Sequence, residues 1–112
     1  MKRSRSFLRY RNGQRDANHA GIATGLRKLG YLVMDLAGAG NGAPDLMVFA
    51  RTGRPVFIEV KTAKGKLRES QKAFAARLTS CDVAHGVART LDEALMLVGH
   101  DVRALTPDGK AR

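Results

Sequence analysis

Two short segments, Pro44-Asp45 and Glu59-Val60-Lys61, contain the acids and the lysine that are candidates for a reactive site. Side chains two positions apart in a strand point to the same face, so Glu59 and Lys61 are expected to project together. The apolar residues around them alternate with them and take the other face: Val56, Ile58 and Val60. The pattern predicts a strand with one core face and one charged face.

A glycine-containing turn at residues 51–54 can fold the chain back and bring Asp45 near Glu59 at one end of a sheet. Two carboxylates beside a lysine suit Mg²⁺, which prefers oxygen ligands and keeps several waters. Such an ion polarises a phosphate and lowers the pKa of a bound water. A lysine can orient that water or stabilise charge that develops on phosphoryl oxygens.

A second interpretation needs no chemistry. Glu59 and Lys61 can be solvent-facing residues of an edge strand, where lysine is common as protection against aggregation. On the strand pattern alone this is the more common case, because isolated charged strand residues are frequent.

The rest of the sequence predicts the helices and strands that surround these residues. Helices are expected over 16–29, 68–79 and 90–98, and strands over 31–36, 45–50, 55–61 and 82–88. The strands at 45–50 and 55–61 form an antiparallel hairpin, and the helix at 68–79 is a crossover to the strand at 82–88. The order α-β-β-β-α-β-α indicates an α/β (α+β) fold with a mixed central sheet flanked by helices.

Two regions frame this core. Residues 1–14 are rich in Arg and Ser and are interpreted as a basic N-terminal arm, with a short element around 7–10 as the alternative. Residues 15–112 form a single domain, with a possible further strand at 102–105. Within the first predicted helix, Ile22, Ala23, Leu26 and Leu29 share an apolar stripe.

The net charge of the chain indicates the class of its binding partner. The chain of 112 residues has 20 Lys+Arg against 10 Asp+Glu, a formal net charge of +10. Such an excess favours a polyanion such as nucleic acid as the binding partner, although a solubility charge or a structural RNA-binding protein of ribosomal type also explains it.

The single Cys81 excludes an internal disulfide framework. Without an apolar run of ~20 residues or a signal-like start, no membrane association is expected, and the location is expected to be cytoplasmic.

A longer pattern identifies a resemblance. Gly42-Ala43-Pro44-Asp45-Leu46, then Glu59-Val60-Lys61, then Gly65-Lys66-Leu67-Arg68-Glu69-Ser70-Gln71, resembles the PD-(D/E)xK nuclease superfamily. More narrowly it is similar to the VRR-NUC family, including small stand-alone phage and bacterial members. The bare PD…ExK pattern is weak, and the glycine-rich approach and downstream glutamine make it more specific. The resemblance implies a restriction-endonuclease-like core over roughly residues 15 to 98.

The resemblance also implies roles for individual residues. Asp45 and Glu59 would be metal-binding carboxylates, the carbonyl of Val60 a further ligand, Lys61 the catalytic lysine, and Gln71 a residue lining the site. Family members place an acid, most often Glu, on the first helix. The nearest match is Asp16, which is shorter and can equally be a helix cap. Nearby His19 is interpreted as a hydrogen-bonding residue rather than a ligand or general base.

The expected function is therefore a Mg²⁺-dependent endonuclease, with Mn²⁺ as a substitute, that hydrolyses phosphodiester bonds in branched or junction DNA. Six basic residues are expected to bind the DNA: Lys64, Lys66, Arg68, Lys72, Arg9 and Arg11. A double cut at a junction requires two sites, so a homodimer is expected, in a bacterial or phage-infected cell. No small-molecule cofactor is expected. The alternative is a non-catalytic nucleic-acid-binding module with a nuclease-like fold.

Overall fold

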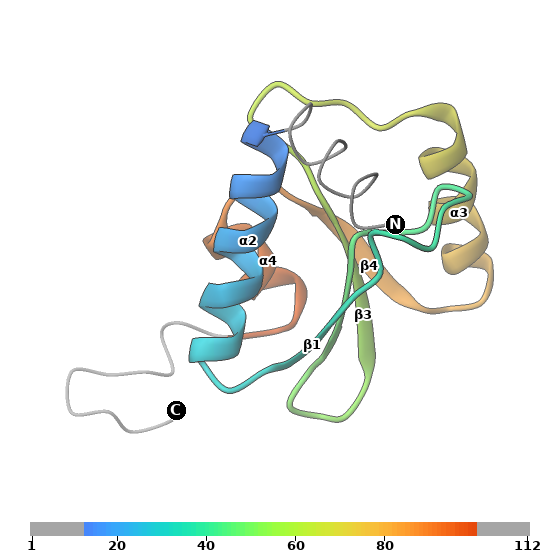
Figure 1. Cartoon of the computed structure of the whole chain (residues 1–112). Coiled ribbons are helices and arrows are strands. Elements are labelled where there is room, and N and C mark those ends of the chain that lie inside the picture. The colour runs from blue at the N-terminus through green and yellow to red at the C-terminus, as the bar shows by residue number, and fades with distance from the viewer. Residues whose placement is uncertain (1–12, 101–112) are drawn as a thin grey trace.

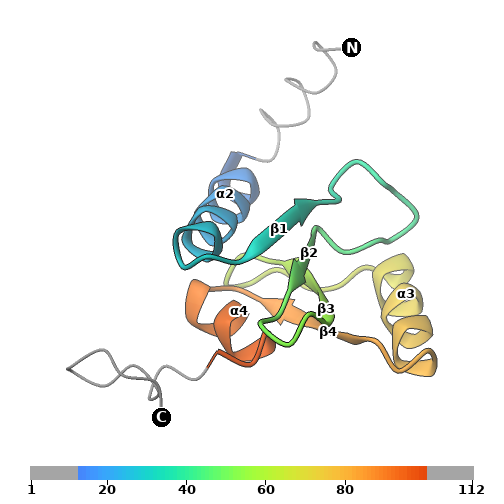
Figure 2. The same ribbon diagram turned by 90° about the horizontal axis from the view of Figure 1, so that it is seen from below.

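The computed structural model describes residues 13–100 and has the predicted order of helices and strands (Figure 1). The elements, labelled as in Figures 1 and 2, are α2 (Gly13–Lys28), β1 (Leu32–Asp35), β2 (Leu46–Phe49), β3 (Pro55–Val60), α3 (Glu69–Ser80), β4 (Ala84–Ala88) and α4 (Leu91–Leu97). The predicted α/β fold with a mixed, helix-flanked sheet is confirmed.

The sheet has the order β1-β2-β3-β4. β2 pairs antiparallel with both β1 and β3, and the register of the hairpin places Leu46 opposite Ile58. β4 pairs parallel with β3, because the chain passes through α3 before it returns to the sheet. β3 therefore lies between two strands and is not an edge strand.

The two faces of the sheet are covered differently (Figures 1 and 2). α2 and α4 pack against each other and against one face, while α3 lies on the other face and packs against β4. The core lies under α2 and α4, where alternate strand residues meet the apolar side of the helices. Its fully buried members include Leu26, Leu46, Val48, Ile58 and Val60.

Several boundaries differ from the predicted ones. α2 begins at Gly13, three residues before the predicted start, and Asp16 therefore lies inside the helix rather than at its cap. At its other end, the helix stops at Lys28, and Gly30 with φ +93° turns the chain toward β1. Leu29 leaves the apolar stripe for this reason and is 38% exposed, so its predicted core position is wrong.

The last helix begins as its sequence predicts. Thr90 is the N-cap of α4, and its hydroxyl accepts a hydrogen bond from the backbone N–H of Glu93 at 3.1 Å. The Glu93 carboxylate accepts from the N–H of Arg89 at 2.6 Å, one residue before the cap. This arrangement fixes the end of β4 against the start of α4.

Two of the sequence predictions lie outside the described residues: the basic arm, apart from its last two residues, and the possible strand at 102–105. Within residues 13–100, no helix is both long and apolar enough to cross a membrane.

Candidate active site

The hairpin of β2 and β3 brings the predicted carboxylates to one end of the sheet. Asp45 directly precedes β2, and Glu59 is the next-to-last residue of β3. The Asp45 carboxylate accepts a hydrogen bond from the backbone N–H of Val60, with Oδ2 at 2.8 Å from that nitrogen. Asp45 is only 2% exposed and Glu59 only 5%. The turn between the strands therefore places the two buried acids beside each other across the hairpin, because Leu46, which follows Asp45, pairs with Ile58, which precedes Glu59.

Gln71 connects this end of the sheet to the start of α3. Its Nε2 donates to Glu59 Oε2 at 2.9 Å, while its Oε1 accepts from the backbone N–H of Arg68 at 2.8 Å. Arg68 is the N-cap of α3, so the amide of Gln71 also satisfies one of the unpaired groups at the helix start. The three-residue spacing from cap to glutamine thus orients the amide toward Glu59.

This double role gives a first prediction. Replacing Gln71 by Ala removes the cap bond and leaves Glu59 with one hydrogen bond fewer, so we expect a loss of about 1–2 kcal/mol in the free energy of unfolding. The check is chemical denaturation, with the exposed neighbour variant Ser70→Ala as the control. Equal stability of the two variants would contradict the role of Gln71 as a cap.

Lys61 completes the charged set. It directly follows β3, is 8% exposed, and places Nζ at 3.6 Å from Glu59 Oε2. The interpretation of Glu59 and Lys61 as solvent-facing residues of an edge strand is wrong, because β3 is internal and both side chains are buried. Burying ionised groups costs free energy unless they are paired, which makes this cluster an unusual feature of so small a domain.

Two residues that the sequence analysis missed hold the end of β3 in place. Asn18 on α2 donates from Nδ2 to the carbonyls of Lys61 at 2.8 Å and Arg89 at 3.3 Å. Arg89, after β4, donates from Nη2 to the carbonyl of Gly65 at 2.7 Å. A β-carbon built on Gly65 would lie 3.4 Å from the Lys61 side chain, so the loop after β3 packs directly on the lysine. No pattern in the sequence marks an isolated asparagine or arginine for such contacts.

The other predicted site residues divide into two groups. Lys64, Lys66, Arg68 and Lys72 are all exposed, along the loop after β3 and the first turn of α3, next to Gln71. Asp16 lies in α2, but its side chain is outside what the structure describes, as are Arg9 and Arg11 entirely. The roles predicted for these three residues stay predictions.

The donor set suits a hard divalent cation. Asp45 and Glu59 are buried carboxylates next to the Val60 backbone. With both acids ionised and Lys61 as the one buried lysine among the described residues, the cluster has a net negative charge that favours a cation. Among the described side chains there is no group of three His, Cys, Asp or Glu residues that could hold a metal. Two carboxylates are nevertheless enough for Mg²⁺, which retains several waters. His19 does not join them, since its Nε2 faces Asp35 Oδ2 at 3.4 Å, at the end of β1.

A mixed sheet with an acid at the start of one strand and Glu-x-Lys at the end of the next is the arrangement of the PD-(D/E)xK nuclease superfamily. A family model of the VRR-NUC domain matches residues 5–91. A solved structure described as a VRR_NUC domain is similar, with a TM-score of 0.61 and 25% sequence identity over 77% of this chain and 95% of that chain. A comparison with curated proteins found no match. The chain belongs to the VRR-NUC family, and its described part is a nuclease-like domain.

Proposed function

We propose that this protein is a metal-dependent endonuclease that hydrolyses phosphodiester bonds in DNA. The observation that carries the proposal is the buried cluster of Asp45, Glu59, Lys61 and Gln71 at one end of the sheet. Buried charges cost stability, so a small domain that retains three of them at one end of its sheet is organised for binding or chemistry rather than for folding alone.

In this proposal, Asp45, Glu59 and the carbonyl of Val60 hold Mg²⁺ or Mn²⁺, with Asp16 as a candidate further ligand. The ion supplies a Lewis acid that polarises the phosphate and makes water a better nucleophile. The chain's own contribution is to hold the carboxylates in place. The Val60 N–H holds Asp45, and the Gln71 amide holds Glu59. These bonds orient the acids before any substrate arrives.

Lys61 and Gln71 act beside the carboxylates. The ammonium of Lys61 is available to an anionic phosphate, and its attraction to the phosphoryl oxygens grows as charge develops on them during hydrolysis. Gln71 retains a lone pair on Oε1 and lies close enough to the site to contact water or phosphate. The loop held by Arg89 packs against the stem of Lys61.

The DNA backbone is proposed to lie along the exposed basic residues next to the site: Lys64, Lys66, Arg68 and Lys72. Contacts of this kind neutralise phosphates and release counterions, so they give affinity without sequence preference. Selectivity for branched or junction DNA would then come from the shape of the substrate.

A cleavage assay tests the proposal. Supercoiled plasmid, a four-way junction, a flap and plain duplex are incubated with Mg²⁺ or Mn²⁺, with EDTA and the Asp45→Ala variant as controls. We expect cleavage that EDTA and the variant both abolish, while the variant still binds DNA with the same salt dependence. Tight, salt-sensitive binding without cleavage of any substrate would instead favour a non-catalytic nucleic-acid-binding module.

We also propose that the protein acts as a homodimer. β1 is an edge strand, and the face of it turned away from the core exposes two apolar side chains, Leu32 at 63% and Met34 at 44%. Exposed apolar residues side by side at a sheet edge favour association. A second copy is the occupant that gives a double cut its second site.

The dimer gives a second prediction. The variant Leu32→Lys/Met34→Lys is expected to be monomeric by light scattering at a concentration where the unmodified protein is dimeric. Met96→Lys is the matched control, because Met96 is 76% exposed on α4, away from this edge. A monomeric unmodified protein, or a variant that remains dimeric, would contradict this interface.

A further inference from the structure

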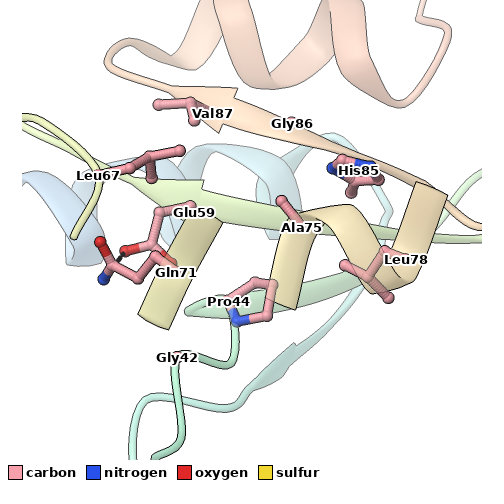
Figure 3. A pocket seen from close by; sticks show the side chains of 10 residues that line it. All are labelled: Gly42, Pro44, Glu59, Leu67, Gln71, Ala75, Leu78, His85, Gly86 and Val87. Atoms are coloured by element: carbon pink, nitrogen blue, oxygen red, sulfur yellow. Dashed lines mark hydrogen bonds between the residues drawn. The ribbon is translucent and has the colours of Figure 1, made fainter. Parts of the chain in front are cut away.

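A hollow lies between α3 and the sheet, directly beside the candidate active site (Figure 3). Its volume is about 190 Å³. Glu59 and Gln71 lie at one end and His85 at the other, while the middle is apolar. The apolar lining comes from the loop before β2, the loop after β3, α3 and β4: Pro44, Leu67, Ala75, Leu78 and Val87.

The small side chain of Ala75 leaves this space open. Ala75 is four residues after Gln71, so both project from the same side of α3, and Figure 3 shows Ala75 between Gln71 and Leu78. The hollow is partly open to the surface, and a larger residue at position 75 would occupy it and bury more of its apolar lining. The chain has a small residue there instead.

We propose that this hollow binds one unstacked nucleobase of the DNA strand that is cut. The inference rests on the proposed function and names the class of substrate: DNA in which a base next to the scissile bond is unpaired. An engineered apolar cavity of about 150 Å³ accepts benzene, so a space of this size accepts the ring of a base. The polar groups at its two ends can meet the polar edge of the base.

The position of the hollow supports this occupant. Glu59 and Gln71 belong both to the hollow and to the candidate active site, so a base in the hollow is part of a nucleotide whose phosphate lies at the carboxylates. Leu67, at its wall, lies between the exposed Lys66 and Arg68, whose charges complement the strand backbone. A base stacked in a continuous duplex cannot enter, since it must first leave the stack. Flaps, junctions and single strands supply such a base at lower cost.

The test fills the hollow. Ala75→Leu adds three carbon atoms that occupy the space, and Ala76→Leu adds the same atoms on the exposed side of the same helix. We expect Ala75→Leu to keep or raise Tm and to lower kcat/KM on a flap or single strand by about tenfold. Ala76→Leu is expected to leave kcat/KM within about twofold of the unmodified protein. If Ala75→Leu raises Tm and cuts as well as Ala76→Leu, the hollow is only a packing gap and the inference is wrong.

A second experiment leaves the hollow intact and removes the base from the substrate. An abasic nucleotide at the position next to the scissile phosphate is expected to reduce cleavage by the unmodified protein about tenfold, with little further effect on Ala75→Leu. Equal loss in both proteins would overturn the inference, because the base would then bind elsewhere. This comparison remains informative if Ala75→Leu folds poorly, since the unmodified protein must still discriminate the abasic substrate.

A binding measurement separates this inference from the proposed function. In EDTA, fluorescence anisotropy gives the dissociation constants of an oligothymidylate and its singly abasic analogues. Weaker binding of an abasic analogue by the unmodified protein, lost in Ala75→Leu, supports the pocket even if no substrate is cleaved. Cleavage together with equal binding of all analogues and no effect of Ala75→Leu would leave the nuclease intact and reject the pocket.

Discussion

Replacing Glu59 by Gln is expected to lower kcat on any DNA substrate by about 10³-fold or more. Glu59 is the acid that Gln71 and Lys61 both contact, and the substitution removes its charge while keeping its size. A neutral amide is a weaker ligand for a hard cation and a weaker partner for the Lys61 ammonium. The measurement is single-turnover cleavage at saturating enzyme and Mg²⁺.

The control for this variant is Glu69→Gln. Glu69 lies on the exposed start of α3, where its side chain is 93% exposed and its carboxylate lies 3.4 Å from the Lys72 ammonium. It carries the same change of charge near the same loop, and we expect kcat to stay within about twofold. A Glu59→Gln protein that folds normally and cleaves at the unmodified rate would remove Glu59 from the chemistry and with it the proposed mechanism.

Replacing Lys61 by Met is expected to lower kcat by about 10²–10⁴-fold while the dissociation constant for DNA changes by less than about threefold. Methionine keeps most of the apolar stem that packs against Gly65 and removes only the ammonium. Because Lys61 is buried beside Glu59, we expect it to act on the reacting phosphate rather than to contribute to the overall affinity for DNA. Single-turnover rates and anisotropy titrations measure the two quantities separately.

The matched control is Lys66→Met, an exposed residue on the loop after β3. Its loss removes one phosphate contact, so binding should weaken and depend less steeply on salt, while kcat at saturation is preserved. If Lys61→Met instead weakens binding and leaves kcat unchanged, Lys61 belongs to the DNA-binding surface and is not catalytic.

Lys61→Met also has an expected signature in stability. The substitution removes the cationic partner of a buried acid, so the Tm of the variant in EDTA should be lower than that of the unmodified protein. Addition of Mg²⁺ should then raise the Tm of the variant by more than it raises the Tm of the unmodified protein. Thermal denaturation with and without Mg²⁺ measures this difference. An identical Mg²⁺-induced shift in the two proteins would indicate that no ion binds next to Lys61.

Much of the fold could be predicted because its signals are local. The alternation of Val56, Ile58 and Val60 predicts a strand with one core face, and all three are buried under the helices. Thr90 and Glu93 mark the start of α4 through a capping pattern four residues long. The same locality explains the error at Leu29, where an apolar residue continues the helical spacing but the chain has already turned at Gly30.

The site was predictable to a similar degree. The resemblance named Asp45, Glu59, Lys61 and Gln71, and the structure places these four side chains together. It does not describe the side chain of Asp16, so the acid expected on the first helix stays a prediction. Asn18 and Arg89 were missed because their contacts join positions far apart in the chain: 43 residues separate Asn18 from Lys61, and 24 separate Arg89 from Gly65.

The local sequence was enough to predict the types of the candidate site residues and the strand face on which they lie, since spacing along one strand or one helix turn needs no knowledge of the rest of the chain. The burial of Glu59 and Lys61, in contrast, depends on the assembled sheet. The strand pattern is the same for an edge strand and a central one, and β3 becomes central when β4 returns after α3 to pair beside it. The hollow under α3 has the same origin, because an alanine in a helix creates a cavity only where the opposing face of a sheet leaves it unfilled.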